Sequence, residues 1–179
     1  MMMITVPALG WWMKRGAPNG LLMLRRIHLA LTSVVIAIGG VIMFLYGPGE
    51  LSFFPIAAIG ASVLPFAYFK IRTDAAPWPP GTGAGNIAAG YRARYFLNAG
   101  VALTVFVWGT VISIEFVEAW WPYMMAAPIS ILCFWSIGPT AAHIERLQAA
   151  IRQQGLPVDL LDALNEPLPP KASDDSPDR

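Results

Sequence analysis

Four long apolar stretches dominate the pattern of hydrophobic and polar positions along the chain. They cover about residues 27–46, 51–69, 95–114 and 120–137, and none of them contains Asp, Glu, Lys or Arg. A helix of about 20 apolar residues is long enough to cross the hydrocarbon core of a membrane. The pattern therefore predicts an all-α membrane protein whose core is a four-helix transmembrane bundle, residues 27–138, arranged as two hairpins.

The segments between the stretches differ in length and composition. Residues 47–50 and 115–119 are short, and Gly47-Pro48-Gly49-Glu50 has the residues of a tight turn. Residues 70–94 are longer and rich in Pro and Gly, which predicts an irregular loop. Each half of the chain thus has the same order of a basic edge, a span, an acidic turn and a second span. The halves share almost no residue identity, so the pattern does not decide whether they arose by duplication.

The two ends of the chain have their own patterns. Residues 1–26 place Trp11 and Trp12 beside basic residues, which predicts a segment lying at the membrane interface. Residues 139–164 repeat apolar positions at helical spacing, with charged residues opposite, which predicts an amphipathic cytoplasmic helical segment. Residues 165–179 are polar, and we expect this tail to be disordered.

Basic residues alternate perfectly with the apolar stretches. All twelve Lys and Arg residues lie before the first stretch, between the second and third, or after the fourth. Cytoplasmic loops retain Lys and Arg near membrane spans, so both termini are predicted to be cytoplasmic. The first stretch is too long for a signal peptide and lacks a cleavage site, so we expect it to be retained. These features favour a multi-pass protein of a bacterial cytoplasmic membrane.

Composition excludes several function classes. The 179 residues are 56% hydrophobic and 13% charged, whereas soluble domains are about 25% charged. The basic residues come in pairs at predicted membrane edges rather than in one patch, which argues against nucleic-acid binding. The single cysteine, Cys133, cannot form an internal disulfide or a thiolate metal site, and we expect it to be a buried apolar residue.

Candidate chemistry is sparse. The uncharged spans argue against a proton pump or a carrier that relies on an intramembrane carboxylate. No nucleophile has an evident base, so we predict neither an enzyme nor a cofactor. His28 and His143 lie near the same predicted membrane face and are the weak candidates for haem or metal ligands. The alternative is that both are interfacial residues without a ligand.

Polar and proline residues near the spans give a second set of candidates. Asn98 is the strongest polar group within a span, and its amide is expected to form an interhelical hydrogen bond or, alternatively, to contact a substrate. Pro65 and Pro128 lie deep in their spans and could free backbone carbonyl groups for a ligand. Paired small residues four positions apart, such as Ala57/Ala61 and Gly109/Ser113, permit close helix contact within the bundle or with other membrane helices.

The outer turns carry the remaining candidates. Glu115 and Glu118 are three residues apart at the end of the third stretch, which predicts that they share one helix face. Carboxylates there oppose the helix dipole, and Glu50 lies in the other outer turn. They could bind a cation or a partner, or form a solvated turn.

These observations favour a non-catalytic accessory, assembly or scaffold subunit that contacts the bilayer and other membrane subunits or itself. The alternatives are a small oligomeric transporter or channel, and a haem-bearing electron-transfer protein.

Overall fold

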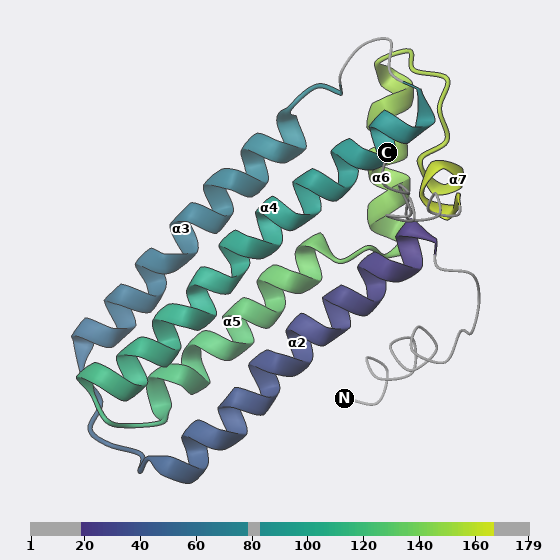
Figure 1. The fold of residues 1–179 in the computed structure, drawn as a ribbon. Coiled ribbons are helices and arrows are strands. Elements are labelled where there is room, and N and C mark those ends of the chain that lie inside the picture. The colour runs from purple at the N-terminus through teal and green to yellow at the C-terminus, as the bar shows by residue number, and fades with distance from the viewer. Residues whose placement is uncertain (1–18, 79–82, 167–179) are drawn as a thin grey trace, which may run out of the picture.

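The computed structural model describes residues 19–78 and 83–166, and every regular element in those residues is a helix (Figure 1). Most of the predicted interfacial segment 1–26, namely residues 1–18, and most of the predicted tail 165–179, namely residues 167–179, lie outside the described part. The elements are α2 (Gly20–Leu45), α3 (Phe53–Ala75), α4 (Ala84–Val111), the π-helical turn η1 (Ile112–Phe116), α5 (Trp121–Ile137), α6 (Ala141–Gln153) and α7 (Leu160–Asn165).

Three of these segments are long and apolar enough to cross a membrane, namely α2, α3 and α4 together with η1. A fourth crossing requires α5, which has 17 residues and rises about 26 Å, slightly less than the ~30 Å hydrocarbon core. α5 passes the length test only together with α6, from which it is bent by 48°. The chain therefore has three to four candidate spans.

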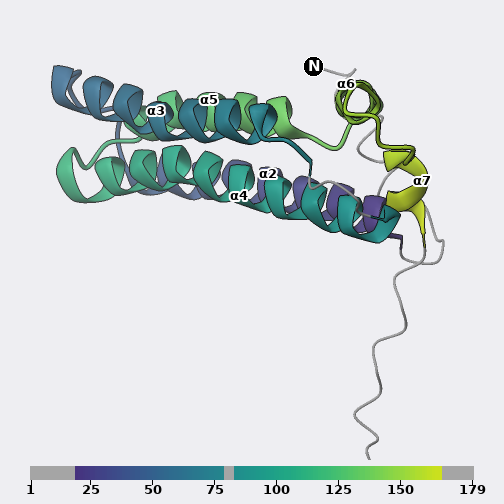
Figure 2. The same cartoon turned by 90° about the horizontal axis from the view of Figure 1, so that it is seen from above.

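The helices pack around a central pair, α4 and α5. α3 packs on α4, and α2 packs on α5, so that α2 and α3 lie at opposite edges of the group (Figures 1 and 2). α6 and α7 lie across one end. The sequence predicts two hairpins, but the first two helices, although consecutive, are separated by the second pair. Long-range contacts therefore decide the arrangement.

Small residues bring α4 and α5 close together. A Cβ added at Gly109 would lie under 3.0 Å from the Cβ of Ala126, nearer than real side chains approach. Farther along the same interface, Ser130 Oγ donates a hydrogen bond of 3.2 Å to the carbonyl oxygen of Ala102. Tyr123 then joins this pair to α2, because its hydroxyl donates to the carbonyl oxygen of Val35. Close backbone approach of this kind suits an interface in lipid, where no hydrophobic effect drives helices together.

The two short turns meet at one end of the molecule, called here the acidic end because its described charged residues, Glu50, Glu115 and Glu118, are all acidic. The backbone N–H of Trp120 donates to the carbonyl oxygen of Gly47 over 3.0 Å, and the indole of Trp121 donates to that of Glu50. Glu115 belongs to η1, but Glu118 lies beyond it with a φ of 49°. The prediction that Glu115 and Glu118 share one helix face is therefore wrong, because the helix ends between them.

The opposite end, called here the basic end, holds every described Lys and Arg residue, together with α6 and α7. Residues 70–94 were predicted to form an irregular loop, but α3 continues to Ala75 and α4 begins at Ala84. That prediction is wrong for most of the segment, because both helices continue through charged residues beyond their apolar parts. Ala76 ends α3 in an extended conformation, which the following Pro77 favours.

Candidate functional site

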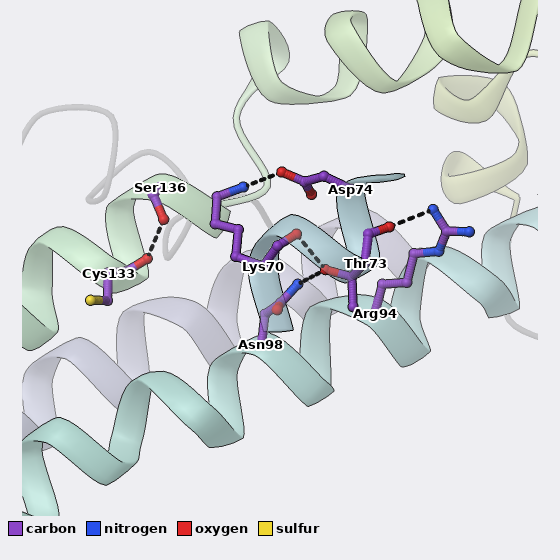
Figure 3. A network of polar contacts seen from close by, with 7 residues as sticks. All are labelled: Lys70, Thr73, Asp74, Arg94, Asn98, Cys133 and Ser136. Carbon is purple, nitrogen blue, oxygen red and sulfur yellow. Dashed lines mark hydrogen bonds and ion pairs between the residues drawn. The ribbon is translucent and has the colours of Figure 1, made fainter. Parts of the chain in front are cut away.

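A polar pocket lies at the basic end, between the ends of α3, α4 and α5 and the start of α6. Its polar lining includes side chains from three helices, namely Lys70, Thr73, Asp74, Tyr91, Asn98 and His143. Figure 3 shows four of them: Lys70, Thr73, Asp74 and Asn98. The cavity measures about 20 Å³, which is room for one or two water molecules and too little for an organic substrate.

Asn98 links α4 to α3 inside this pocket. Its amide Nδ2 donates a hydrogen bond of 2.8 Å to Thr73 Oγ1, whose hydroxyl in turn donates to the carbonyl oxygen of Lys70 over 3.1 Å (Figure 3). Asn98 thus forms the interhelical hydrogen bond expected of it. Since the Thr73 proton is committed to Lys70, Thr73 Oγ1 acts as an acceptor, which fixes the orientation of the Asn98 amide.

The mouth of the pocket carries an ion pair within α3. Lys70 Nζ lies 2.6 Å from a carboxylate oxygen of Asp74, one helical turn away. The side chain of Lys70 is 23% exposed and that of Asp74 is 48% exposed, so solvent screens the pair and it contributes only about 0.3–0.5 kcal/mol to stability. Its main effect is to place two compensating charges beside the polar lining.

Arg94 holds the end of α3 and the chain that follows it. Its guanidinium donates hydrogen bonds of 3.0–3.1 Å to the carbonyl oxygens of Thr73, Ala76 and Pro77. The same group lies 4.0 Å from the ring centroid of Trp78, a cation–π contact with a side chain that is only 3% exposed. Arg94 thereby satisfies carbonyl groups that the end of a helix leaves without partners.

Two tyrosines on one face of α4 stand beside the two histidines. The ring nitrogen Nδ1 of His28 lies 3.2 Å from the hydroxyl of Tyr95, within hydrogen-bond distance. The ring of His143 lies 6.5 Å from that of Tyr91, one turn earlier on α4. The structure thus brings both predicted histidines to the basic end, each beside a different tyrosine. This arrangement gives no support to a haem held between them.

Two buried polar atoms of the lining have no hydrogen-bond partner: the hydroxyl oxygen of Tyr91 and the amide oxygen Oδ1 of Asn98. Tyr91 is 2% exposed and Asn98 is 5% exposed. Leaving a buried polar group unpaired costs about 1–3 kcal/mol, so two such groups in one small pocket call for an explanation.

His143 lies on α6, beyond the apolar helices, and its surroundings favour the neutral ring. Burial lowers the pKa of His143 below its ordinary value because it desolvates the imidazolium, and the positive charges of Lys70 and Arg146 act in the same direction. The carboxylate of Asp74 opposes them. Protonation of His143 therefore works against its packed position beside Tyr91.

The other predicted candidates lie away from this pocket. Pro65 and Pro128 are exposed, so both prolines face outward from the packed helices. Glu50, Glu115 and Glu118 are exposed at the acidic end. Among the described residues, no group of three or more His, Cys, Asp or Glu side chains is placed to hold a metal ion.

Sequence reasoning did not identify Tyr91, Thr73 or Arg94 as members of a polar cluster. One signal was present, because Tyr91, Tyr95 and Asn98 are spaced at i, i+4 and i+7, which places them on one helix face. The prediction that α4 begins near residue 95 hid this face.

No protein-family model matches the chain, and comparisons with curated proteins and with solved structures give no significant match. Proposals for its function therefore rest on its own residues and geometry.

Proposed function

We propose that this protein is a non-catalytic accessory, assembly or scaffold subunit, which binds another membrane subunit or a second copy of itself through the outward face of α2. One observation carries the proposal. α2 lies at an edge of the packed helices, and a row of exposed small residues follows its outward face: Ala30, Ser33, Ala37 and Gly40.

The spacing of this row gives it a physical meaning. Its members recur every three or four residues, so they form one continuous strip over about three helical turns. A Cβ added at Gly40 would meet nothing within 4 Å, so the strip is open rather than filled by the protein's own side chains. In a bilayer such strips let a second helix approach closely, and close packing is what drives helices together there.

The predicted pairs of small residues fall into two groups. Gly109, Ser113, Ala126 and Ser130 are buried and belong to the α4–α5 interface. Ala57 and Ala61 are exposed. The sequence pattern alone does not distinguish pairs that pack within the protein from pairs that are open to another helix. In the structure the buried pairs pack within the chain, whereas the exposed positions remain open.

We place the protein in a bacterial cytoplasmic membrane with four spans and both termini cytoplasmic. In this arrangement α5 is the fourth span, and α6 is an amphipathic helix at the inner surface. Two features support it. The described Lys and Arg residues gather at the basic end, as expected of a cytoplasmic side. On α6, Ile144 and Ile151 are buried whereas Glu145, Arg146 and Arg152 are exposed.

Reporter fusions test this topology. Fusions after Gly49 and Ala119 are expected to report the outer side, and fusions after Gly83 and Gly155 the inner side. An inner signal at Gly49 would overturn the arrangement without bearing on the α2 strip.

Two matched substitutions test the strip itself. Ala37→Leu fills the strip on α2 with a large side chain. Ala67→Leu makes the same change at an exposed position of α3 where the neighbours Leu64, Tyr68 and Ile71 are already large and exposed. Both variants and the native protein are purified in a mild detergent, and the mass of each complex is measured by light scattering and its components by mass spectrometry.

The native protein and Ala67→Leu are expected to purify in a stoichiometric complex, either with another subunit or with a second copy. Ala37→Leu is expected to purify as a monomer with unchanged helicity. A native protein that is already monomeric and alone, or a complex that survives Ala37→Leu, would contradict the proposal.

The transporter alternative is not favoured by these observations. It invoked Pro65 and Pro128 as breaks that free carbonyl groups for a ligand, yet both prolines are exposed on the outward faces of continuous helices.

A further inference from the structure

The two unpartnered atoms of the pocket point to a ligand of particular chemistry. The hydroxyl of Tyr91 and the Oδ1 atom of Asn98 belong to side chains that are more than nine-tenths buried, and both side chains line the same pocket. The hydroxyl can donate or accept a hydrogen bond, whereas Oδ1 can only accept one. A ligand that satisfies both atoms must therefore be able to donate a hydrogen bond to Asn98 Oδ1.

The orientation of Asn98 is fixed by its neighbours. Turning the amide by 180° would place an oxygen against Thr73 Oγ1, whose proton already goes to the carbonyl oxygen of Lys70. Thr73 would then have to give up its bond to Lys70 in order to donate to Asn98, or the two oxygens would face each other without a proton between them. The accepting atom of Asn98 consequently remains unpaired in the pocket.

Charge and size narrow the choice of ligand. A cation is disfavoured because the positive charges of Lys70 and Arg94 also line the pocket, against the single carboxylate of Asp74. An anion is disfavoured because it would face the acceptor Oδ1 of Asn98, and because the guanidinium of Arg94 is already bonded to three carbonyl oxygens. The cavity of about 20 Å³ excludes anything much larger than water.

We propose that this pocket is a hydration site, in which one or two ordered water molecules donate to Asn98 Oδ1 and accept from the Tyr91 hydroxyl. Both atoms belong to α4, and the water lies in a pocket that residues of α3 and α6 also line. This proposal depends only on the geometry of the basic end, so it is independent of which partner the α2 strip binds.

Removing the Tyr91 hydroxyl distinguishes a hydrated pocket from a dry one by the sign of the effect. If water accepts from this hydroxyl, Tyr91→Phe loses a hydrogen bond and lowers the melting temperature by about 2–4 °C. In a dry pocket the same change removes an unsatisfied buried group, so the melting temperature stays the same or rises.

Two further variants calibrate the measurement. Tyr95→Phe removes a hydroxyl that lies within hydrogen-bond distance of His28, and shows what the loss of a paired hydroxyl costs at this depth. Tyr68→Phe removes a hydroxyl from an exposed side chain and is expected to leave the melting temperature unchanged.

A high-resolution experimental structure of the native protein provides the second arm. Water density is expected within about 2.6–3.2 Å of Asn98 Oδ1 and of the Tyr91 hydroxyl. Supporting results are a lowered melting temperature for Tyr91→Phe together with that density. An unchanged or raised melting temperature, or a pocket without density, would overturn the proposal.

Discussion

The substitution Gly109→Ala tests whether the close approach of α4 and α5 holds the structure together. A Cβ at this position would fall under 3.0 Å from the Cβ of Ala126, whereas carbon atoms in contact normally lie about 3.5–4.0 Å apart. Neither atom is the end of a flexible side chain, so the strain cannot be relieved by a change of rotamer. The two helices must separate locally.

The size of the effect follows from this separation. A gap of about 0.5–1 Å already forfeits a quarter to a half of the dispersion energy of each contact across an interface. Overpacking a well-packed core by one carbon typically costs about 1–3 kcal/mol. Replacing a helical glycine by alanine also gains up to about 1 kcal/mol, which the control Gly100→Ala shares, since its Cβ would meet nothing within 4 Å. The two variants are therefore expected to differ by about 1–3 kcal/mol.

The chain contains its own reporter for the assay. Cys133 is the only thiol in the sequence and is 7% exposed, so a thiol reagent reaches it chiefly when the packed helices open. Unfolding in detergent is followed by thiol labelling and by circular dichroism, and the free energy of unfolding is compared among the variants. Gly109→Ala is expected to label faster than Gly100→Ala.

A second substitution provides the decisive control. Ala126→Gly removes the opposing Cβ, so adding Gly109→Ala to it should cost much less than adding it to the native protein. The double-mutant cycle is expected to give a coupling energy of about 1–3 kcal/mol. If Gly109→Ala behaves like Gly100→Ala, or if the cycle shows no coupling, the reasoning about the α4–α5 contact fails.

Two other predictions concern the basic end. Arg94→Lys is expected to lower the free energy of unfolding by about 1–3 kcal/mol, because an ammonium group cannot reach three carbonyl oxygens at the end of α3 and also stack on Trp78. A denaturation series measures this change, and an unchanged midpoint would contradict the role given to Arg94. The pKa of His143 is lowered by burial, Lys70 and Arg146, so the unfolded chain binds the proton more tightly. The contribution of neutral His143 to stability is present above the unfolded pKa of about 6.5 and is lost as the pH falls through the folded pKa. His143→Gln should flatten this part of the stability–pH curve, and a curve of the same shape would refute the assignment.

The sequence predicts helical class and apolar segments well, because each apolar stretch is a local property of the chain. Each of the four stretches lies largely within one helix, in the order α2, α3, α4 and α5. The limits of the helices are predicted less well. Lys70 and Arg92 are polar and suggest a loop, yet both lie within helices that continue beyond their apolar parts. Hydropathy marks where a membrane would end, and a helix need not end there.

The candidate site was only partly predictable for a different reason. Asn98 attracts notice because an amide in an apolar stretch needs a partner, and it has one in Thr73. Nothing in the sequence identifies Thr73 as that partner, since the pairing depends on the register between α3 and α4. Likewise, Arg94 reads as a residue that marks a membrane side, and only the path of residues 73–78 reveals that it binds their carbonyl groups.

The order of the helices in space has a consequence for how the protein is made. α2 and α3 emerge from the ribosome first, yet each finds its main partner in α4 or α5, which are synthesised later. The turn after α2 likewise gains its contact with Trp120, whose N–H donates to the carbonyl oxygen of Gly47, only after Trp120 has been synthesised. The first two helices therefore reach this arrangement only once the second half of the chain is present to separate and hold them.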